Sequence, residues 1–558
     1  MRRVLYFVVA AVAILMSVGS AKAQSVEQNK DFELGRSIEI LANIMYTFDE
    51  YFVSELSADD MLSAAVMGLT RITDPFSAYY SEKDMEGFDI QTTGKYGGVG
   101  SAISKKGDYV VFAEPYKGSP ADLAGIKAGD KILAIDGKDM KGAATDVVSK
   151  SLKGDPETDV VVKVERLIGK KVETITIRRS RITIPSVSYS GILRDGIGYI
   201  EHNDFIEGSY DEVRRALEAL LAQGELRGLV LDYRSNRGGS VVEAVNIASL
   251  FVDHGECIVS MIGRDSSSLR NYNTSHSPIA RDIPIVILVN PNTASSSEIL
   301  AGALQDMDRA VVMGQRTYGK GLVQATIPVG YNTYVKVTTD KYYIPSGRCI
   351  HAHDYVARYN GESGEVPDSL ISEFKTRGGR KVYDGGGIVP DVKIEPKYWS
   401  HFAVAVHGQG HIRDWVDEYV LKHRDLKVDV RSFKLSDSDY ADFCRYVEDK
   451  DVPYESETRA ALKTLEEALE NDLYDEALRD DFHRFASLIK DDKMSNMQTY
   501  RREIENLLVT EILTRYAYRE GATEHSVCND PEVERAVELL LNAEEYNRIL
   551  REQDLSKR

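Results

Sequence analysis

The chain has 558 residues, of which 43% are hydrophobic and 28% are charged, a composition typical of globular protein with three to four domains. Collagen-like, mostly disordered and polytopic membrane proteins are excluded. The formal net charge of −19 argues against a general nucleic-acid binder, because such a surface repels phosphate. The four cysteines are too few for a disulfide scaffold. Their spacing favours free thiols, although three pairings are possible.

The N-terminus has the three parts of a secretory signal peptide. Arg2 and Arg3 precede an apolar run over residues 4–16, and small residues follow up to Ala23. The run is short for a membrane span. We therefore expect a signal peptide over residues 1–23, cleavage after Ala23, and an exported protein, periplasmic or extracellular, without a remaining membrane span.

The mature chain divides into four regions with different patterns. Residues 24–85 carry apolar positions at helical spacing and predict a helical segment. Residues 86–180 alternate glycine-rich turns with short β-branched runs, which predicts a small β-rich domain. Residues 181–399 alternate strands and helices and predict an α/β core, whereas residues 400–558 are mostly charged helix. The fold class is therefore multidomain, combining α+β and α/β parts.

Two apolar stripes mark the C-terminal helices. They consist of Leu462, Leu465, Leu469 and Leu473, and of Val533, Val537, Leu540 and Leu541. Such a stripe is a core face or a partner face. The region could therefore pack internally, form a homodimer or bind an adaptor protein.

A serine cluster follows a predicted strand. The apolar run at residues 283–289 leads into a turn of small residues, and a helix pattern begins at Ser297. Unpaired N–H groups at a helix N-terminus favour negative charge. A serine nucleophile needs this setting, because its tetrahedral intermediate carries an oxyanion. An ordinary N-cap would give the same local pattern.

A second window places a lysine between two glycines. Lys320 lies between Gly319 and Gly321, where backbone can approach closely and screen the amine from water. Burial lowers the pKa of a lysine, and a neutral lysine can accept the serine proton. Gln324, four residues later, can hydrogen-bond the lysine nitrogen. The two windows together predict Ser–Lys chemistry.

Other chemistries are less well supported. The serine cluster contains no G-x-S-x-G elbow, which argues against a Ser-His-Asp triad of the hydrolase type. His351 and His353 lack further ligands at metal-site spacing. We therefore expect no metal and no organic cofactor.

Both windows resemble those of the C-terminal processing peptidases, also called tail-specific proteases. The family patterns S-A-S-A-S-E-I and T-F-G-K-G-x-V-Q correspond to T-A-S-S-S-E-I and T-Y-G-K-G-L-V-Q in this sequence. The resemblance implies that Ser295 is the nucleophile, Lys320 the general base and Gln324 its supporting amide. The sequence departs from the family at Thr293 and Ser296, so that three serines run together.

A glycine pair follows another predicted strand. Residues 228–233 form an apolar run, and R-S-N-R-G-G follows. Such a turn can present a backbone N–H to an anion. It is similar to the family's N-x-x-G-G, which implies an oxyanion hole made by Gly238 or Gly239 together with the backbone N–H of Ser296. A simple turn would use the same glycines.

The β-rich domain resembles a PDZ domain, because the run G-S-P-A-D-L-A-G-I-K-A-G-D at residues 118–130 is typical of a PDZ helix and turn. The resemblance implies a carboxylate-binding loop and a strand edge that bind the C-termini of other proteins. The same surface could act as an autoinhibitory lid. The loop consists of Tyr96, Gly97, Gly98, Val99 and Gly100.

The resemblance thus implies a serine endopeptidase that cleaves proteins after recognising their C-terminal tails. A non-proteolytic PDZ scaffold and a small-molecule esterase are the alternatives. The intact serine, lysine and glutamine argue against the first, and the peptide-binding domain argues against the second. The resemblance covers residues 35–395. It assigns no role to the insert at residues 349–385 or to residues 400–558.

Overall fold

The computed structural model describes residues 30–353, 355, 366, 368–397, 399–472, 474–489 and 492–551. The predicted signal peptide and part of the 349–385 insert lie outside these residues. Among the described residues, no helix is both long and apolar enough to span a bilayer.

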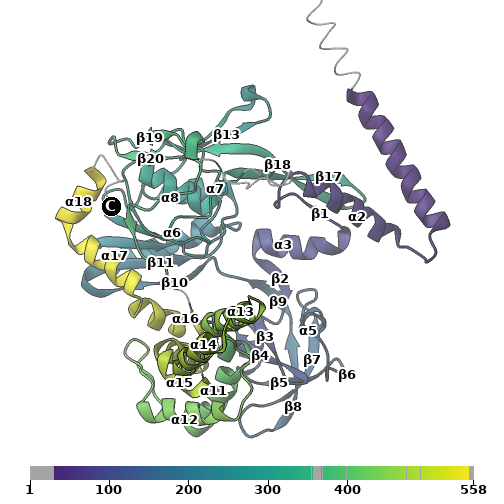
Figure 1. Cartoon of the computed structure of the whole chain (residues 1–558). Coiled ribbons are helices and arrows are strands. Elements are labelled where there is room, and N and C mark those ends of the chain that lie inside the picture. Colours follow the sequence, from purple (N-terminus) through teal and green to yellow (C-terminus); the bar gives the residue numbers. More distant parts are fainter. Residues whose placement is uncertain are drawn as a thin grey trace, which may run out of the picture. The chain divides into compact units, whose positions relative to one another are not determined.

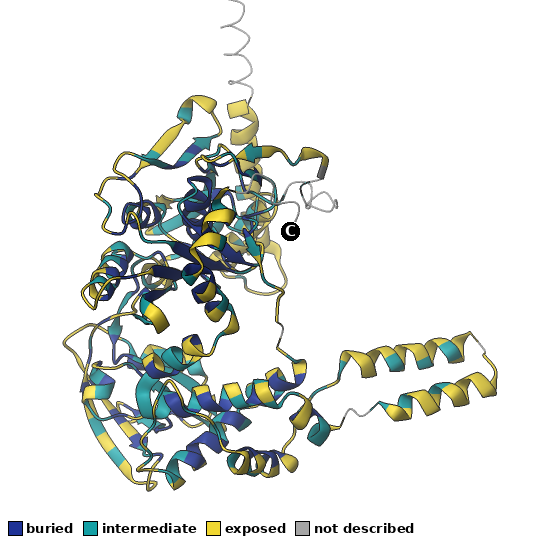
Figure 2. Cartoon of the chain, turned by 90° about the vertical axis from the view of Figure 1, so that its left-hand side faces the viewer, coloured by how far each residue is buried: buried dark blue, intermediate teal, exposed yellow. Residues whose placement is uncertain are grey.

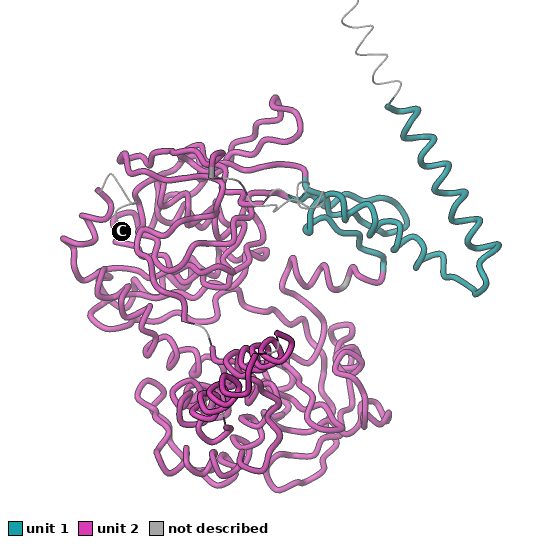
Figure 3. The backbone as a smooth tube through the Cα atoms, in the orientation of Figure 1, with its two compact units in different colours: residues 1–82, 324–338, 355–364 teal, residues 83–323, 339–354, 365–558 magenta. Residues whose placement is uncertain are grey.

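The chain forms two compact units (Figure 3). Unit 1 comprises residues 1–82, 324–338 and 355–364. Unit 2 comprises residues 83–323, 339–354 and 365–558. The elements of each unit carry the labels of Figure 1.

Unit 1 is mostly helical at its start. Residues 30–51 are helical, and α2 (Ala58–Arg71) begins at Ser57, whose side chain accepts from the N–H of Asp60. The strand β1 (Ala78–Tyr80) then pairs antiparallel with residues 334–336 of β18 (Thr333–Tyr343), which also pairs with β17 (Leu322–Gly330). The expectation of a helical N-terminal segment is confirmed, with one short strand added.

Unit 2 begins with the β-rich domain. Its sheet has the order β3-β4-β5-β7-β8, which leaves β3 with one free edge, and β7 alternates buried and exposed residues as a half-buried strand should. The elements are η1 (Glu82–Asp84, at the boundary), α3 (Met85–Thr93), β2 (Lys95–Gly98), β3 (Ser101–Lys106), β4 (Tyr109–Pro115), α4 (Pro120–Leu123), β5 (Lys131–Ile135), β6 (Lys138–Asp139), α5 (Thr145–Leu152), β7 (Asp159–Glu165), β8 (Val172–Arg178) and β9 (Ser180–Thr183).

The α/β core is a six-stranded sheet with the order β10-β11-β12-β15-β16-β21. All neighbours except β10 and β11 are parallel. Every residue of β12 and β15 is buried, because a parallel sheet is covered on both faces. The strands are β10 (Val187–Ile192), β11 (Ile197–His202), β12 (Gly228–Asp232), β15 (Ile285–Val289), β16 (Val311–Gly314) and β21 (Val392–Lys393).

Three helices and smaller elements accompany this sheet. The buried apolar side chains of α6, α7 and α8 pack in one cluster with those of β12 and β15. The elements are η2 (Arg194–Gly196), α6 (Ser209–Leu221), α7 (Val241–Ala248), β13 (Cys257–Gly263), η3 (Ser266–Ser268), β14 (Arg270–Asn273), α8 (Ser296–Asp306), η4 (Asp368–Leu370), β19 (Glu373–Lys375) and β20 (Lys381–Tyr383).

The last two helices cover the other face of the sheet. The buried apolar residues of α17 (Pro531–Leu541) and α18 (Ala543–Arg551) pack in a second cluster with strand residues such as Val230 and Val286. The hydroxyl of Tyr546 donates to the carbonyl of Ile285 and accepts from its N–H, each at 3.0 Å. The second C-terminal stripe is therefore a core face.

A separate core around Phe402, Trp415 and Phe443 is shared by α10 (His401–Gly408), α11 (His411–Lys422), α12 (Asp437–Glu448), α15 (Lys493–Thr499) and α16 (Arg501–Cys528). Two further helices, α13 (Glu457–Asn471) and α14 (Glu476–Leu488), lie between α12 and α15 in the chain. The hairpin of α13 and α14 projects from them and has no buried residue (Figure 2). Three leucines of the first stripe lie on α13, and Leu473 lies outside the described residues.

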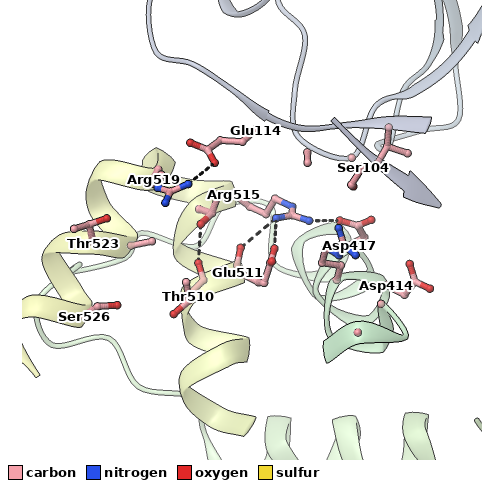
Figure 4. Close-up of a pocket in the computed structure, with 18 of the residues that line it drawn as sticks. Ser104, Glu114, Asp414, Asp417, Thr510, Glu511, Arg515, Arg519, Thr523 and Ser526 are labelled. Atoms are coloured by element: carbon pink, nitrogen blue, oxygen red, sulfur yellow. Dashed lines mark hydrogen bonds and ion pairs between the residues drawn. The ribbon is translucent and has the colours of Figure 1, made fainter. Parts of the chain in front are cut away.

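The helix α16 contacts the β-rich domain through charged side chains (Figure 4). Arg519 lies 3.6 Å from Glu114. Asp417 of α11 receives Arg515 at 3.2 Å and Lys106 of β3 at 2.6 Å. These groups line a polar cavity of about 560 Å³. Ion pairs thus contribute to this contact.

All four cysteines are free thiols in the structure. Cys444 is buried and Cys528 is exposed, whereas Cys257 and Cys349 are half-buried. These four cysteines therefore form no disulfide between the domains.

Removing the hydroxyl of Tyr546 tests whether α18 is part of the core. Tyr546→Phe leaves the buried N–H and carbonyl of Ile285 without this partner, so we expect a loss of about 1–3 kcal/mol of unfolding free energy. Urea denaturation measures it. The control is Tyr331→Phe, because Tyr331 is fully exposed. Equal stability of both variants would contradict this role of α18.

Candidate active site

Ser295 lies where β15 turns into α8. Its backbone has φ 58° and ψ −119°, a region that non-glycine residues rarely adopt and that recurs at functional sites. Ser295 is half-buried, and the first helical residue after it is Ser296. A strained turn thus presents one serine at the N-terminus of a buried helix.

The three consecutive serines have different environments. The hydroxyl of Ser296 donates to the carbonyl of Gly239 at 2.8 Å, and that of Ser297 donates to the carbonyl of Asn236 at 3.0 Å. Both residues are fully buried. Ser295 is therefore the one serine of the three that is accessible.

A buried carboxylate joins the serine turn to the lysine loop. One oxygen of Glu298 accepts the N–H groups of Ser295 and Lys320, at 2.8 and 2.9 Å. The other accepts the N–H of Gly319 at 2.7 Å and the hydroxyl of Thr317 at 2.5 Å. Burial raises the pKa of Glu298, and these four hydrogen bonds oppose that shift. The carboxylate fixes the backbone of both windows.

Tyr342 supports the same two loops from β18. Its hydroxyl donates to the carbonyl of Lys320 at 2.5 Å and lies 3.3 Å from the carbonyl of Ser295. The ring is fully buried. The two windows are therefore bridged on their carbonyl side as well as on their N–H side.

The glycine turn after β12 wraps around the serine turn. The carbonyl of Asn236 accepts the N–H of Ala294 at 3.0 Å. Gly238 has φ 88°, and a Cβ there would lie 2.7 Å from the nitrogen of Ser296. Only glycine fits this close approach.

The two candidate oxyanion glycines differ in their bonding. The N–H of Gly238 donates to the side-chain oxygen of Asn236 at 2.8 Å, so it is already used inside the turn. The carbonyl of Gly239 accepts the Ser296 hydroxyl. Within the described contacts, the N–H of Gly239 and that of Ser296 have no protein acceptor. Gly239 is exposed, whereas Ser296 is buried.

Gln324 lies in unit 1, whereas Ser295 and Lys320 lie in unit 2. Its side-chain amide donates to the hydroxyl of Thr338 at 3.0 Å. The hydrogen bond orients Gln324 within its own unit.

Three family models match the sequence. "Peptidase family S41" covers residues 196–358, "PDZ domain" covers residues 111–166, and "Probable PDZ-protease, C-terminal helical domain" covers residues 402–540. A probable CtpA-like serine protease of Staphylococcus aureus (strain bovine RF122 / ET3-1) is 34% identical over 355 residues, which are 63% of this chain and 67% of the relative. The chain belongs to peptidase family S41.

Further relatives agree with this assignment. A probable CtpA-like serine protease of Staphylococcus saprophyticus is 30% identical over 368 residues, 66% of this chain and 71% of the relative. The S41 chain is therefore a serine-type C-terminal processing peptidase. The expectations of a multidomain fold and of a PDZ domain are confirmed.

Solved structures with matching parts include two proteases. The photosystem II D1 C-terminal processing protease is 29% identical and covers 63% of this chain and 86% of its own, with a TM-score of 0.34. A putative S41 protease from Bacteroides fragilis NCTC 9343 is 16% identical, covers 55% and 84%, and has a TM-score of 0.35.

The predicted carboxylate loop of the S41 peptidase is partly engaged in its own fold. Residues 95–98 form β2 and pair with β9 rather than with β3, and a Cβ on Gly97 would meet the carbonyl of Gly154 at 2.1 Å. Val99 and Gly100 lie between β2 and β3. Of the five loop residues, these two adjoin the free strand edge, whereas Tyr96, Gly97 and Gly98 hold the loop in place.

The histidines near the lysine loop play a structural part. The N–H of Gly321 donates to Nδ1 of His351 at 3.3 Å. Burial lowers the pKa of His351 to about 4, so the ring is neutral at pH 7. Within the described residues, no group of three or more His, Cys, Asp or Glu side chains could hold a metal ion.

Several residues that shape the site were not found from the sequence. In the sequence, Glu298 is part of the serine motif and has no predicted role of its own. No role was predicted for Asn236 or Tyr342. Polar residues beside the serine and glycine turns were the available signal. It was weak, because their partners are distant in sequence.

We expect a buried histidine to make the folded S41 peptidase less stable in acid. The carbonyl of His202 accepts the side-chain N–H of Asn236 at 2.7 Å, and burial lowers the pKa of the His202 ring from 6.5 to about 3. The unfolded chain therefore binds the proton first, and stability falls as the pH decreases below 6.5. Between this pH and about pH 5, the unfolding free energy should fall by roughly 2 kcal/mol.

The matched variant is His202→Leu. Its unfolding free energy should depend less on pH over that interval, and the difference should correspond to the binding of one proton. Urea denaturation at several pH values measures it. Parallel pH profiles for the two proteins would contradict the assignment.

Replacing Glu298 tests the carboxylate bridge. In Glu298→Gln, the amide NH2 cannot accept hydrogen bonds from the backbone N–H groups that it faces. The two loops should therefore separate, and kcat should fall roughly 100-fold. Steady-state kinetics against Glu218→Gln, an exposed control on α6, measures this. Unchanged kcat would show that the bridge does not position the site.

Proposed function

We propose that this S41 peptidase uses a Ser–Lys dyad, with Ser295 as nucleophile and Lys320 as general base. The observation that carries the proposal is the shared Glu298 carboxylate, which accepts the N–H groups of both residues. The strained backbone and accessibility of Ser295 support the same role. Gln324 is assigned to the dyad from its motif position alone.

The reaction proceeds by acyl transfer. Ser295 Oγ attacks the peptide carbonyl carbon while the neutral Lys320 amine takes the hydroxyl proton. Collapse of the tetrahedral intermediate breaks the C–N bond, and the lysine returns the proton to the leaving amine. Water, deprotonated by the same lysine, then attacks the acyl carbon, the ester bond to Ser295 Oγ breaks, and the lysine returns the proton to Ser295 Oγ.

The oxyanion is proposed to bind the N–H of Ser296 and that of Gly239. The N–H of Gly238 is already donated to Asn236, which supports the choice of Gly239 between the two glycines. Gly238 has a different part, because its lack of a side chain lets the turn approach Ser296. A preorganised pair of N–H groups stabilises the developing charge.

The PDZ domain is proposed to bind the C-terminal tail of a protein substrate. The free edge of β3 can accept an added strand, and the loop at Val99 and Gly100 precedes it. The helix α5 contacts β3 and would form the other side of the groove. The full binding loop is proposed as residues 96–100.

The signal-peptide pattern supports export to the periplasm or the cell exterior. The projecting hairpin of α13 and α14 exposes apolar side chains such as Leu465 and Phe485, which supports contact with an adaptor or a second copy. Both proposals extend beyond the peptidase assignment.

The deciding experiment follows cleavage of an unfolded protein with an apolar C-terminal tail by mass spectrometry. We expect Ser295→Ala and Lys320→Ala to lower kcat at least 1,000-fold, because removing the nucleophile or the base removes the acyl-transfer route. Lys341→Ala is the matched control, since it removes a lysine from the exposed part of β18.

The same assay tests the tail. Amidation of the substrate C-terminus should raise KM without lowering kcat as strongly, because it removes the carboxylate. Cleavage that persists in Lys320→Ala would refute the dyad. Indifference to amidation would refute carboxylate recognition and leave the dyad standing.

A further inference from the structure

Arg234 lies at the start of the turn that carries Gly238 and Gly239, and its guanidinium lies among three carboxylates. Nε is 3.0 Å from an oxygen of Asp232, two residues earlier in the chain. Nη1 is 2.7 Å from Asp530 and 3.2 Å from Glu532. The last two residues are 296 and 298 positions away in sequence.

The three carboxylates belong to two different elements. Asp232 ends β12 and also accepts the hydroxyl of Tyr199 at 2.7 Å. Asp530 is the N-cap of α17 and accepts the N–H of Glu532. Arg234 therefore connects the sheet to the start of the C-terminal helix.

Packing alone does not hold this side chain. Arg234 borders the polar cavity of about 560 Å³ that is also lined by charged residues of α11, α16 and the PDZ domain (Figure 4 shows part of the lining). The lining also includes apolar residues such as Ala522 and Val527. The guanidinium itself is held by directed ion pairs with carboxylates, which fix its orientation.

The position of Arg234 affects the position of the glycines because hydrogen bonds hold the turn between them. The N–H of Asn236 donates to the carbonyl of Tyr233 at 3.1 Å, and the Asn236 side chain accepts the N–H of Gly238. The space at Gly238 is closed by Ser296. A shift at Arg234 is thus passed to the glycines and, through them, to the oxyanion groups.

We propose that Asp530 and Glu532 are positioning residues that act through Arg234 on the oxyanion turn. The C-terminal helix α17 then positions the oxyanion turn in addition to covering the sheet. This inference rests on the proposed Ser–Lys function. It gives the C-terminal helices a role in catalysis at a distance from the reacting atoms.

The test removes the two charges on α17 and leaves Arg234 in place, because deleting the arginine would strand three carboxylates together. The variant is Asp530→Asn with Glu532→Gln. Asparagine remains a good N-cap, so α17 should persist. The matched control is Glu534→Gln on the same helix, where the exposed carboxylate pairs with Arg194 outside the turn.

We expect kcat to fall roughly 10- to 100-fold with KM changed by no more than about twofold, since misplacement of a catalytic group by a fraction of an ångström has effects of this order. The control should retain wild-type kcat. Glu532→Asp, which keeps the charge, should retain most of it.

A second measurement separates positioning from damage to the fold. A peptide aldehyde forms a tetrahedral adduct with Ser295, and its inhibition constant should rise in step with the loss of kcat. Binding of a tail peptide to the Ser295→Ala protein, with and without the double substitution, should be equal. Hydrogen exchange over residues 233–239 should become faster by roughly tenfold or more.

The outcomes are distinguishable. Wild-type kcat in the double variant, or a loss confined to KM, overturns the positioning role while the dyad stands. Slow exchange over 233–239 equal to that of the wild type also overturns it, even if the variant is less stable. If Ser295→Ala still cleaves, the proposed function fails and the inference fails with it.

Discussion

The carboxylate of Glu298 is the constraint on which the site depends. It binds donors from two loops that follow neighbouring strands, β15 and β16, and the loops would otherwise be independent turns. Three of its four donors are backbone N–H groups, so it fixes main chain rather than side chains. A fully buried carboxylate is costly unless hydrogen-bonded, and these bonds offset that cost. The strained turn at Ser295 persists because the surroundings determine it so strongly.

The parallel sheet explains why these groups meet. The turns after β12, β15 and β16 all leave the sheet at its carboxyl edge, where ligands bind in open α/β sheets. The helix α8 covers one face and α17 and α18 cover the other. A C-terminal region that looks separable in sequence therefore contributes to the core of the peptidase and reaches the turn beside its active site through Arg234.

The contact between the PDZ domain and the helical domain differs from the contact of α17 and α18 with the sheet. Their contacts at α11 and α16 use ion pairs, namely Lys106 with Asp417 and Arg519 with Glu114, around a polar cavity. Partly exposed ion pairs contribute little each and weaken with salt. The apolar cluster under α17 and α18 is the firmer connection, because its side chains are excluded from water. The peptidase thus combines an apolar cluster beneath α17 and α18 with a PDZ domain whose contact to the helical region includes ion pairs.

The sequence by itself determined the parts that depend on local pattern. The order of regions follows from strand and helix periodicity. The PDZ and peptidase assignments and the serine and lysine windows rest on short runs that resemble family motifs. It left open which glycine offers its N–H and which face the C-terminal stripes cover. Only the tertiary structure shows that the N–H of Gly238 already donates to Asn236, that the second stripe packs on the sheet, and that Arg234 meets Asp530 across 296 residues. Such contacts are set by the order of strands in the sheet, which no local window encodes.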